Sequence, residues 1–504
     1  MLQLSAFRRV AAGLAPVGVA LVNSVVADAA GCARPGATRG APRSRSGACA
    51  SRPGSPHPET PVRPHRFIAT VLLVLVAACA TPGAGPDSAA LGRIEVAAPE
   101  AAGFSSERLA RVTQAFREEI DQGRVPGVVI AVARRGKLVY HEALGFQDKA
   151  AGTPMSRDSI FRIYSMTKPL ASVAAMILVE EGRIQLTDPV AKFLPAFATL
   201  QVSVQRREAD GRMASELVPA SRPMLVHDLL RHTAGLAYGE VTPNAVVKEA
   251  YAKAGLFKPG VIDFDTRDLT PTEFTERLAK QPLIGQPGQM WQYSLATDVL
   301  GRVVEAASGQ RLSVFLEQRV FQPLGMKDTA FHVPAEKMSR LAQPFARPTG
   351  GPFVSPQIDV SRPPGNDSGG AGAVGTAMDY LRFAQAMLNA GSLDGRRIVS
   401  RPTAELMMSD HVGDRPSAPV TAPELLLGTQ GYGFGLGFLV RHGAGIAGVP
   451  GSAGEAMWAG YGGTYFWIDP KEQLVAVFMS QGPAATRAYY RKMVKTLVYQ
   501  AIAD

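Results

Sequence analysis

The feature that most constrains this chain is the segment 163–168, Ile-Tyr-Ser-Met-Thr-Lys, where an extended run ends at Ser165. Behind the serine, apolar residues recur at helical spacing as far as Leu178, and Gly182 supplies a C-terminal stop signal. We therefore predict a helix that begins at Ser165. Lys168 follows one turn later on the same face of this helix, so its amine can reach the serine hydroxyl.

This pairing points to nucleophilic catalysis. A serine hydroxyl is a weak nucleophile at its ordinary pKa, and a lysine that is buried enough to be neutral can take its proton. Taken alone, the S-x-x-K spacing also fits a Ser and a Lys with purely structural roles on a helix. The catalytic interpretation therefore depends on the other segments of the chain.

Three further segments support it. Tyr293-Ser294-Leu295 follows a turn cluster and precedes a predicted helix at 297–307, which suits a tyrosine that points into a cleft. A glycine-rich turn at 369–375 precedes a predicted helix at 380–389, and it lacks the G-K-[ST] ending of a phosphate loop. Near the C-terminus, Trp458-Ala459-Gly460 introduces a segment of β character.

In this order, the segments resemble the motifs of the serine β-lactamase and penicillin-binding-protein superfamily. The resemblance extends from about Pro99 to the end of the chain. It implies that Ser165 is the nucleophile and that Lys168 and Tyr293 transfer protons. We expect the nearby lysine to lower the pKa of the Tyr293 phenol.

The Trp458-Ala459-Gly460 segment stands where that superfamily has K-T-G. The resemblance implies that Trp458 and Gly460 border the substrate and that the backbone amides of Tyr461 and Ser165 form an oxyanion hole. The lysine and threonine that would bind a substrate carboxylate are missing. The chain therefore resembles the family VIII carboxylesterases more than the β-lactamases, and Trp458 is expected to offer its N–H and apolar face to a neutral ester.

The implied function is a serine hydrolase that forms an acyl-enzyme with a small ester or amide and needs no cofactor. A β-lactamase or D-amino-acid peptidase is the alternative. A second alternative is a lipoprotein that binds penicillin or cell-wall peptide without turnover. His232 invites a Ser-His-Asp interpretation, but the chain has no G-x-S-x-G elbow, and we favour a histidine that orders a turn near the cleft. Histidine spacing predicts no zinc site.

The net charge of +10 comes mostly from the first 79 residues, which hold nine Arg, one Asp and one Glu. The remainder carries 44 basic and 41 acidic residues. Such a near-neutral body gives no support for nucleic-acid binding. All three cysteines, Cys32, Cys49 and Cys79, lie in the first 79 residues, so the body can form no disulfide.

The leader has the pattern of an exported lipoprotein. Residues 34–66 are rich in Arg, Pro, Gly and Ser, and an apolar run at 67–78 then ends at Cys79. This ending resembles a bacterial lipobox, which implies lipidation of Cys79 and a periplasmic protein anchored to the membrane. We expect residues 1–62 to result from a start codon assigned too far upstream, and residues 80–98 to form a linker.

The order of predicted elements indicates an α+β fold of the β-lactamase/transpeptidase type in residues 99–504. Helix 107–121 is followed by a hairpin, the nucleophile helix, a helical region, further strands and a last helix at 484–501. We expect an antiparallel sheet flanked by helices, with an all-helical lobe at roughly 190–395.

Overall fold

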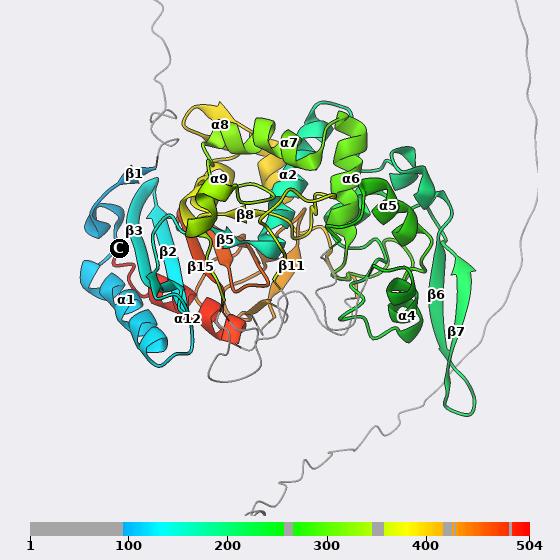
Figure 1. Cartoon of the computed structure of the whole chain (residues 1–504), viewed down its shortest axis with the longest axis horizontal. Helices are drawn as coiled ribbons and strands as arrows, with labels where there is room; N and C mark the ends of the chain where they lie inside the picture. Colours follow the sequence, from blue (N-terminus) through cyan, green and yellow to red (C-terminus); the bar gives the residue numbers. More distant parts are fainter. Residues whose placement is uncertain (1–93, 257–265, 345–356, 417–425, 428–429, 483–485) are drawn as a thin grey trace, which may run out of the picture. The chain divides into compact units, whose positions relative to one another are not determined.

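The computed structural model describes residues 94–256, 266–344, 357–416, 426–427, 430–482 and 486–504 (Figure 1). The predicted leader with Cys79, and the predicted linker as far as residue 93, lie outside these described residues. No helix in the described ranges is long and apolar enough to cross a bilayer.

The main sheet contains the hairpin that the sequence predicts. Strands β2, Gly127–Arg134, and β3, Lys137–Asp148, pair antiparallel. Both residues of the turn between them have positive φ, 54° at Arg135 and 73° at Gly136, as the mirror-image turns of tight hairpins require. Every residue of β2 is buried, so this strand lies inside the sheet and not at its edge.

The strand order of the sheet is β1-β3-β2-β15-β14-β13-β12-β11, and β4 pairs with β3. All neighbours are antiparallel except β1 and β3, which are parallel. The sheet is therefore mixed, whereas an antiparallel sheet was expected. The other strands are β1 Glu95–Val96, β4 Thr153–Pro154, β11 Tyr432–Phe434, β12 Leu439–Arg441, β13 Ala456–Ala459, β14 Tyr465–Asp469 and β15 Leu474–Ser480.

Helices from the two ends of the described chain cover one face of the sheet (Figure 1). They are α1, Ser106–Asp121, and α12, Arg487–Tyr499. The ring of Phe116 on α1 packs on Phe478 of β15 and on Tyr490 of α12, with centroids 5.3 and 6.1 Å apart. The apolar stripe predicted for the first helix therefore faces the core.

The opposite face of the sheet carries α9, Ala377–Leu388. Tyr380 of this helix packs on Phe466 of β14, with ring centroids 4.7 Å apart. Phe466 pairs with Val477, the neighbour of Phe478 along β15. Because successive side chains of a strand point to opposite faces, α9 and α1 cover different faces of the sheet.

The region predicted as an all-helical lobe also contains a β-hairpin. Strands β6, Gln201–Arg207, and β7, Met213–Pro219, stand out from the neighbouring helices in Figure 1. Only Val202 and Val204 of β6 alternate with polar residues, and residues 205–207 are polar and exposed, so the alternating apolar pattern that indicates a strand is short there. The α-helices of this region include α3 Val226–Leu230, α4 Ala245–Lys253, α5 Pro271–Ala279, α6 Ala296–Ser308, α7 Leu312–Leu316 and α8 Gln322–Leu324, and α10, Arg401–Met407, follows it.

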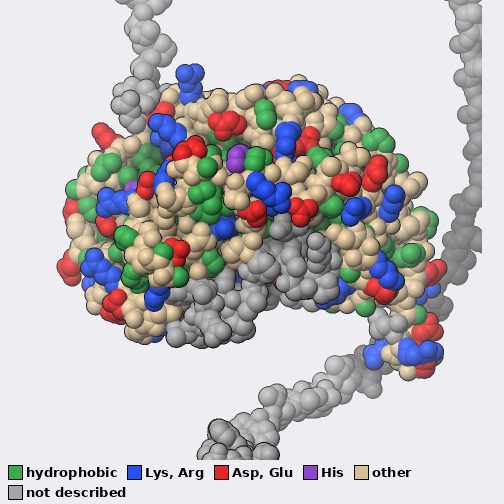
Figure 2. Space-filling model, viewed as in Figure 1, with side chains coloured by type: hydrophobic (Ala, Val, Ile, Leu, Met, Phe, Trp, Pro, Cys, Tyr) green, Lys and Arg blue, Asp and Glu red, His purple; other side chains and the backbone are tan. Residues whose placement is uncertain are grey.

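Charged side chains of both signs are interspersed on the face of the molecule shown in Figure 2. This distribution agrees with the near-neutral charge of the chain after residue 79. A broad surface of one sign, which nucleic-acid binding requires, is not visible on that face.

Candidate active site

Ser165 lies where a short strand turns into a helix. Strand β5, Phe161–Arg162, is followed by a 3₁₀ turn, Tyr164–Met166, and then by α2, Thr167–Glu180. The sequence thus places the change from strand to helix at the right residue. Tyr164 has a φ of 45°, and such a left-handed conformation costs a bulky residue roughly 1–3 kcal/mol.

Surrounding contacts hold Tyr164 in this conformation. Its side chain is buried, and its hydroxyl donates a hydrogen bond of 2.6 Å to Oε1 of Gln357. Its carbonyl accepts a hydrogen bond of 2.6 Å from the hydroxyl of Thr167. The strained residue therefore fixes the direction in which the next side chain, that of Ser165, leaves the turn.

Lys168 is almost completely buried, with 1% of its surface exposed. Its Nζ lies 3.4 Å from Oγ of Ser165 and donates hydrogen bonds to the hydroxyl of Tyr238 at 3.0 Å and the carbonyl of Gly370 at 2.8 Å. Burial lowers the pKa of Lys168 to about 7, although the charge of Asp298 acts in the opposite direction. Much of the amine is therefore neutral at pH 7, as a base for the serine must be.

Tyr293 reaches Ser165 from a distant part of the chain. Its hydroxyl donates a hydrogen bond of 2.7 Å to Oγ of Ser165, and Nζ of Lys168 lies 4.6 Å from the centre of its ring. Burial raises the pKa of Tyr293 well above its ordinary value. The expectation that the lysine lowers this pKa is wrong, because the loss of water around a phenolate outweighs the other effects on the Tyr293 phenol. Tyr293 remains a protonated donor.

Tyr238 also belongs to the site, and the sequence did not identify it. It accepts the 3.0 Å hydrogen bond from Lys168, and its ring centroid lies 5.1 Å from that of Tyr293. Tyr238 follows the segment 229–236, Leu-Leu-Arg-His-Thr-Ala-Gly-Leu, by two residues. Its closeness to His232, which we placed near the cleft, is the sequence signal that could have indicated it.

A buried carboxylate is linked to Lys168 through one glycine. Asp298 of α6 accepts hydrogen bonds from Oγ of Ser368 at 2.5 Å and from the N–H of Gly370 at 3.2 Å. The carbonyl of the same glycine accepts from Lys168. A Cβ on Gly370 would overlap the carboxylate of Asp298. The glycine-rich turn therefore contributes backbone groups to the site, and burial raises the pKa of the Asp298 carboxyl.

His232 lies near the site but hydrogen-bonds other residues. Its Nδ1 is 3.3 Å from Oγ of Ser294, and its Nε2 is 3.5 Å from Oγ1 of Thr297. Burial holds the pKa of His232 well below its usual range, so the ring stays neutral. Its φ of 56° marks a tight turn. This geometry fits a turn-ordering histidine better than the general base of a Ser-His-Asp triad.

Strand β13 brings the Trp-Ala-Gly segment against the nucleophile turn. Gly460 approaches this turn so closely that a Cβ on it would overlap the carbonyl oxygen of Ile163. The ring of Tyr461 meets that of Tyr164 edge-on, with centroids 5.7 Å apart. The Gly460–Tyr461 peptide therefore lies beside the two residues that lead into Ser165.

Trp458 is fully buried, with 0% of its surface exposed. Its ring packs on Tyr293 and Phe434 with centroids 5.5 and 5.3 Å apart. Within the described residues, its Nε1 makes no hydrogen bond of standard geometry. Because aromatic packing occupies its apolar surface, the indole supports the ring of Tyr293. We expected the indole to face the substrate directly.

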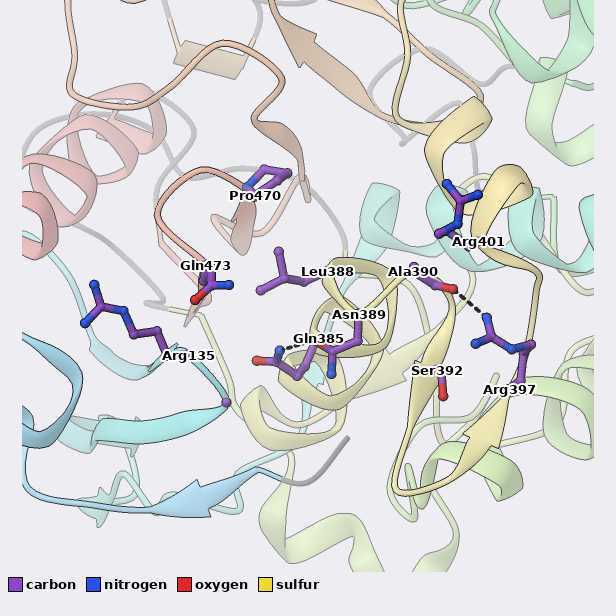
Figure 3. A pocket seen from close by; sticks show the side chains of 11 residues that line it. Arg135, Gln385, Leu388, Asn389, Ala390, Ser392, Arg397, Arg401, Pro470 and Gln473 are labelled. Carbon is purple, nitrogen blue, oxygen red and sulfur yellow. Dashed lines mark hydrogen bonds between the residues drawn. The ribbon is translucent and has the colours of Figure 1, made fainter. Parts of the chain in front are cut away.

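Side chains of His, Cys, Asp and Glu do not gather in groups of three or more that could hold a metal ion, in the part of the chain that the structure describes. Figure 3 shows a cavity of about 460 Å³ elsewhere in the molecule, lined in part by Arg135, Gln385 and Gln473. None of the predicted site residues lines this cavity, so it has no part in the chemistry at Ser165.

Comparisons with known proteins identify the family of this chain. The family model described as Beta-lactamase matches residues 112–499. Protein Rv1367c of Mycobacterium tuberculosis is 34% identical over 382 residues, which cover 73% of this chain and 88% of that protein. Esterase EstB of Burkholderia gladioli is 35% identical over 382 residues, or 71% of this chain and 87% of the esterase. The solved structure of EstCE1, a hydrolase with promiscuous acyltransferase activity, matches this chain with a TM-score of 0.62 and 29% sequence identity. The match covers 78% of this chain and 99% of the EstCE1 chain.

Proposed function

We propose that this chain, which belongs to the beta-lactamase family and is a serine hydrolase, acts as a carboxylesterase on small neutral esters through an acyl-enzyme. One observation carries the proposal. Oγ of Ser165 accepts a hydrogen bond of 2.7 Å from Tyr293 and lies 3.4 Å from the amine of Lys168, whose pKa is lowered to about 7. A nucleophile with a base and an acid beside it is what acyl transfer requires.

In the proposed acylation, the neutral amine of Lys168 takes the proton of Ser165 while Oγ attacks the ester carbonyl. The carbonyl oxygen becomes an oxyanion, which the backbone amides of Ser165 and Tyr461 would stabilise. When the intermediate collapses, the Tyr293 hydroxyl gives its proton to the leaving alcohol. The ammonium of Lys168 then returns a proton to Tyr293, so the resting protonation states are restored.

Deacylation would use the same groups. Water attacks the acyl carbonyl and gives a proton to the Lys168–Tyr293 pair, which returns it to Oγ of Ser165 as the acid leaves. The products are one carboxylic acid and one alcohol. Besides the ester and water, these transfers use side chains and backbone groups of the chain.

The preference for a neutral ester is supported at Trp458. A buried indole stands in the place of the lysine that would meet a substrate carboxylate, so no cation is offered from this position. The relative EstB, which carries the name esterase, shares 35% of its residues over the matched region. Both observations favour esters over anionic β-lactams.

A β-lactamase or D-amino-acid peptidase is the second candidate, and Arg487 favours it. Its guanidinium lies 4.2 Å from the ring centre of Tyr461, where a cation could meet a substrate carboxylate. However, Nη1 of Arg487 already donates a hydrogen bond of 2.5 Å to the carbonyl of Tyr461. We therefore rank this activity below ester hydrolysis.

Three substrates separate the candidates: a short-chain p-nitrophenyl ester, a chromogenic cephalosporin and a fluorescent penicillin. We expect steady ester turnover with a kcat/KM roughly tenfold or more above that for the cephalosporin. Ser165→Ala is the matched control and should turn over neither. A higher kcat/KM for the cephalosporin would favour the second candidate, and one stoichiometric penicillin label without turnover would favour a binding lipoprotein.

We also propose that the protein is exported and anchored to a membrane in the periplasm through a lipid on Cys79. The support is the sequence pattern of a basic flank, the apolar run 67–78 and a linker behind the cysteine. Such a linker would hold the hydrolase away from the membrane surface.

A further inference from the structure

Two arginines of α12 contact the loop that follows β13. Nη2 of Arg491 donates a hydrogen bond of 2.6 Å to the carbonyl oxygen of Gly460. One helical turn earlier, Nη1 of Arg487 donates one of 2.5 Å to the carbonyl oxygen of Tyr461. The first of these bonds matters most here, because the carbonyl of Gly460 and the N–H of Tyr461 belong to one peptide group.

Arg491 is a buried cation that carbonyl groups surround. It is 2% exposed, and its Nη1 donates to the carbonyl of Leu426 at 3.0 Å. Its hydrogen-bond partners among the described residues are all backbone carbonyls, and its Nε has none there. Burial and the charge of Arg487 lower the pKa of Arg491 to about 9, so it still carries its charge at neutral pH.

Among the described residues Arg491 has no carboxylate partner, and a buried charge of this kind is costly, whereas an apolar side chain would fill the same space without this cost. The contrast with Lys495 on the same helix is direct, because that buried amine lies 2.6 Å from the carboxylate of Glu455. The charge of Arg491 therefore calls for a reason other than packing.

We infer that Arg491 strengthens the oxyanion hole from behind by polarising the Gly460–Tyr461 peptide. In a trans peptide the C=O and N–H groups point in opposite directions, so the N–H of Tyr461 points away from Arg491. A charged donor on the carbonyl oxygen draws electrons from the peptide and makes its N–H a stronger donor. The inference rests on the proposed function, in which this N–H binds the oxyanion.

Polarisation of this kind favours the transition state selectively. Negative charge on the substrate oxygen is small in the bound ester and large in the tetrahedral intermediate, so a stronger donor lowers the barrier more than it tightens substrate binding. Arg491 touches no reacting atom in this arrangement and is a positioning residue.

The test begins with Arg491→Met, which removes the charge and keeps the bulk. We expect kcat to fall about tenfold, less than the roughly hundredfold loss of a direct oxyanion donor, with KM changed by less than about threefold. Arg441→Met is the matched control. Arg441 is also buried, at 1% exposed, and donates to backbone carbonyls such as those of Val449 and Pro450, but it lies 3.7 Å from the carboxylate of Glu455. Its variant should lose stability and keep its kcat.

A spectroscopic readout separates polarisation from a structural role. The infrared stretch of the acyl carbonyl is measured in the acyl-enzyme that a slowly hydrolysed ester forms on Ser165. Stronger donors weaken the C=O bond, so the band should lie at lower frequency in the wild type than in Arg491→Met. Arg491→Gln provides a second neutral variant if the methionine variant does not fold, and Arg491→Lys should restore part of the shift.

The outcomes are distinct. A folded neutral variant with the wild-type kcat, or with a reduced kcat and an unshifted carbonyl band, would overturn the inference and leave the esterase proposal intact. If the wild type itself forms no acyl-enzyme at Ser165, the proposed function fails, and the inference fails with it.

Discussion

The hydroxyl of Tyr293 donates a hydrogen bond of 2.7 Å to Oγ of Ser165, whereas the amine of Lys168 lies 3.4 Å from the same oxygen. Burial raises the pKa of Tyr293 and lowers that of Lys168. In the resting site at neutral pH the phenol is therefore protonated, and a substantial fraction of the amine is neutral and can accept a proton. This difference assigns the acid to Tyr293 and the base to Lys168.

Loss of either proton-transfer group should be severe. We expect Lys168→Ala and Tyr293→Phe each to lower kcat for a short-chain ester by about a hundredfold or more. The double variant should be little worse than either single variant, because both residues serve one proton path. Ser165→Ala, which keeps the fold, defines the background rate. Single losses that multiply in the double variant would show that the two residues act independently.

The kcat/KM for a neutral ester should rise with pH through about 7. Lys168 accepts a proton only when it is neutral, and its pKa is lowered to about 7 from 10.5, so the active form dominates above that pH. Because the pKa of Tyr293 is raised, we expect no alkaline decline below the ordinary tyrosine range of about pH 10. The test is to measure kcat/KM against pH with an ester that does not hydrolyse by itself over the pH range used. A kcat/KM that stays constant from acid pH through pH 7 would contradict the assignment of Lys168.

The free energy of unfolding should also depend on pH because of the lowered pKa of Lys168. The folded-state pKa of Lys168, about 7, lies below its ordinary value of 10.5, so between these values the unfolded chain binds more protons than the folded one. The free energy of unfolding therefore rises with pH in this window, and the destabilisation is fully present below pH 7. Lys168→Met removes this pH dependence. The wild type gains stability from about pH 7 toward about pH 10 and the variant does not, so the Tm of the variant minus that of the wild type should decline over this range. A constant difference in Tm would argue against a lowered pKa of Lys168.

Gly460→Ala tests the close approach of the β13 end to the nucleophile turn. An added Cβ would overlap the carbonyl oxygen of Ile163, so the Tyr461 amide must move. We expect a loss of kcat of about tenfold to a hundredfold, since misplacement of an oxyanion donor by a fraction of an ångström is costly. Gly443→Ala is the control, because a Cβ there meets nothing within 4 Å. Equal kcat values for the two variants would contradict the role of this loop.

Lipidation of Cys79 is tested by mass spectrometry of the mature N-terminus in a bacterial host. We expect a diacylglyceryl cysteine and recovery of the protein in the membrane fraction, as the lipobox-like pattern predicts. Cys79→Ala should release the protein into a soluble fraction. An intact Met1, or a soluble wild-type product cut at another position, would refute the anchor.

Local periodicity was sufficient for five helices, α1, α2, α6, α9 and α12, and for the nucleophile pair. Ser165 and Lys168 come together because they lie one helical turn apart, and the amphipathic stripe of residues 107–121 identifies α1 almost to the residue. The hairpin of β6 and β7 escaped prediction because its apolar alternation is short, at Val202 and Val204, and most of its described residues are exposed. Tyr293 was predicted as a site residue from the order of the family segments. Helical or strand periodicity could not connect it to Ser165, which lies 128 residues earlier in the chain.

The sequence by itself therefore determined which side chains are available for chemistry, and the tertiary structure decided their protonation states and partners. Tyr238, Asp298 and Arg491 enter the account only when segments distant in the chain pack around Lys168 and Gly460. The direction of the Tyr293 pKa shift was predicted wrongly for the same reason. A pKa depends on how much water the whole surrounding structure removes from a group, and residue spacing along the chain does not contain that quantity.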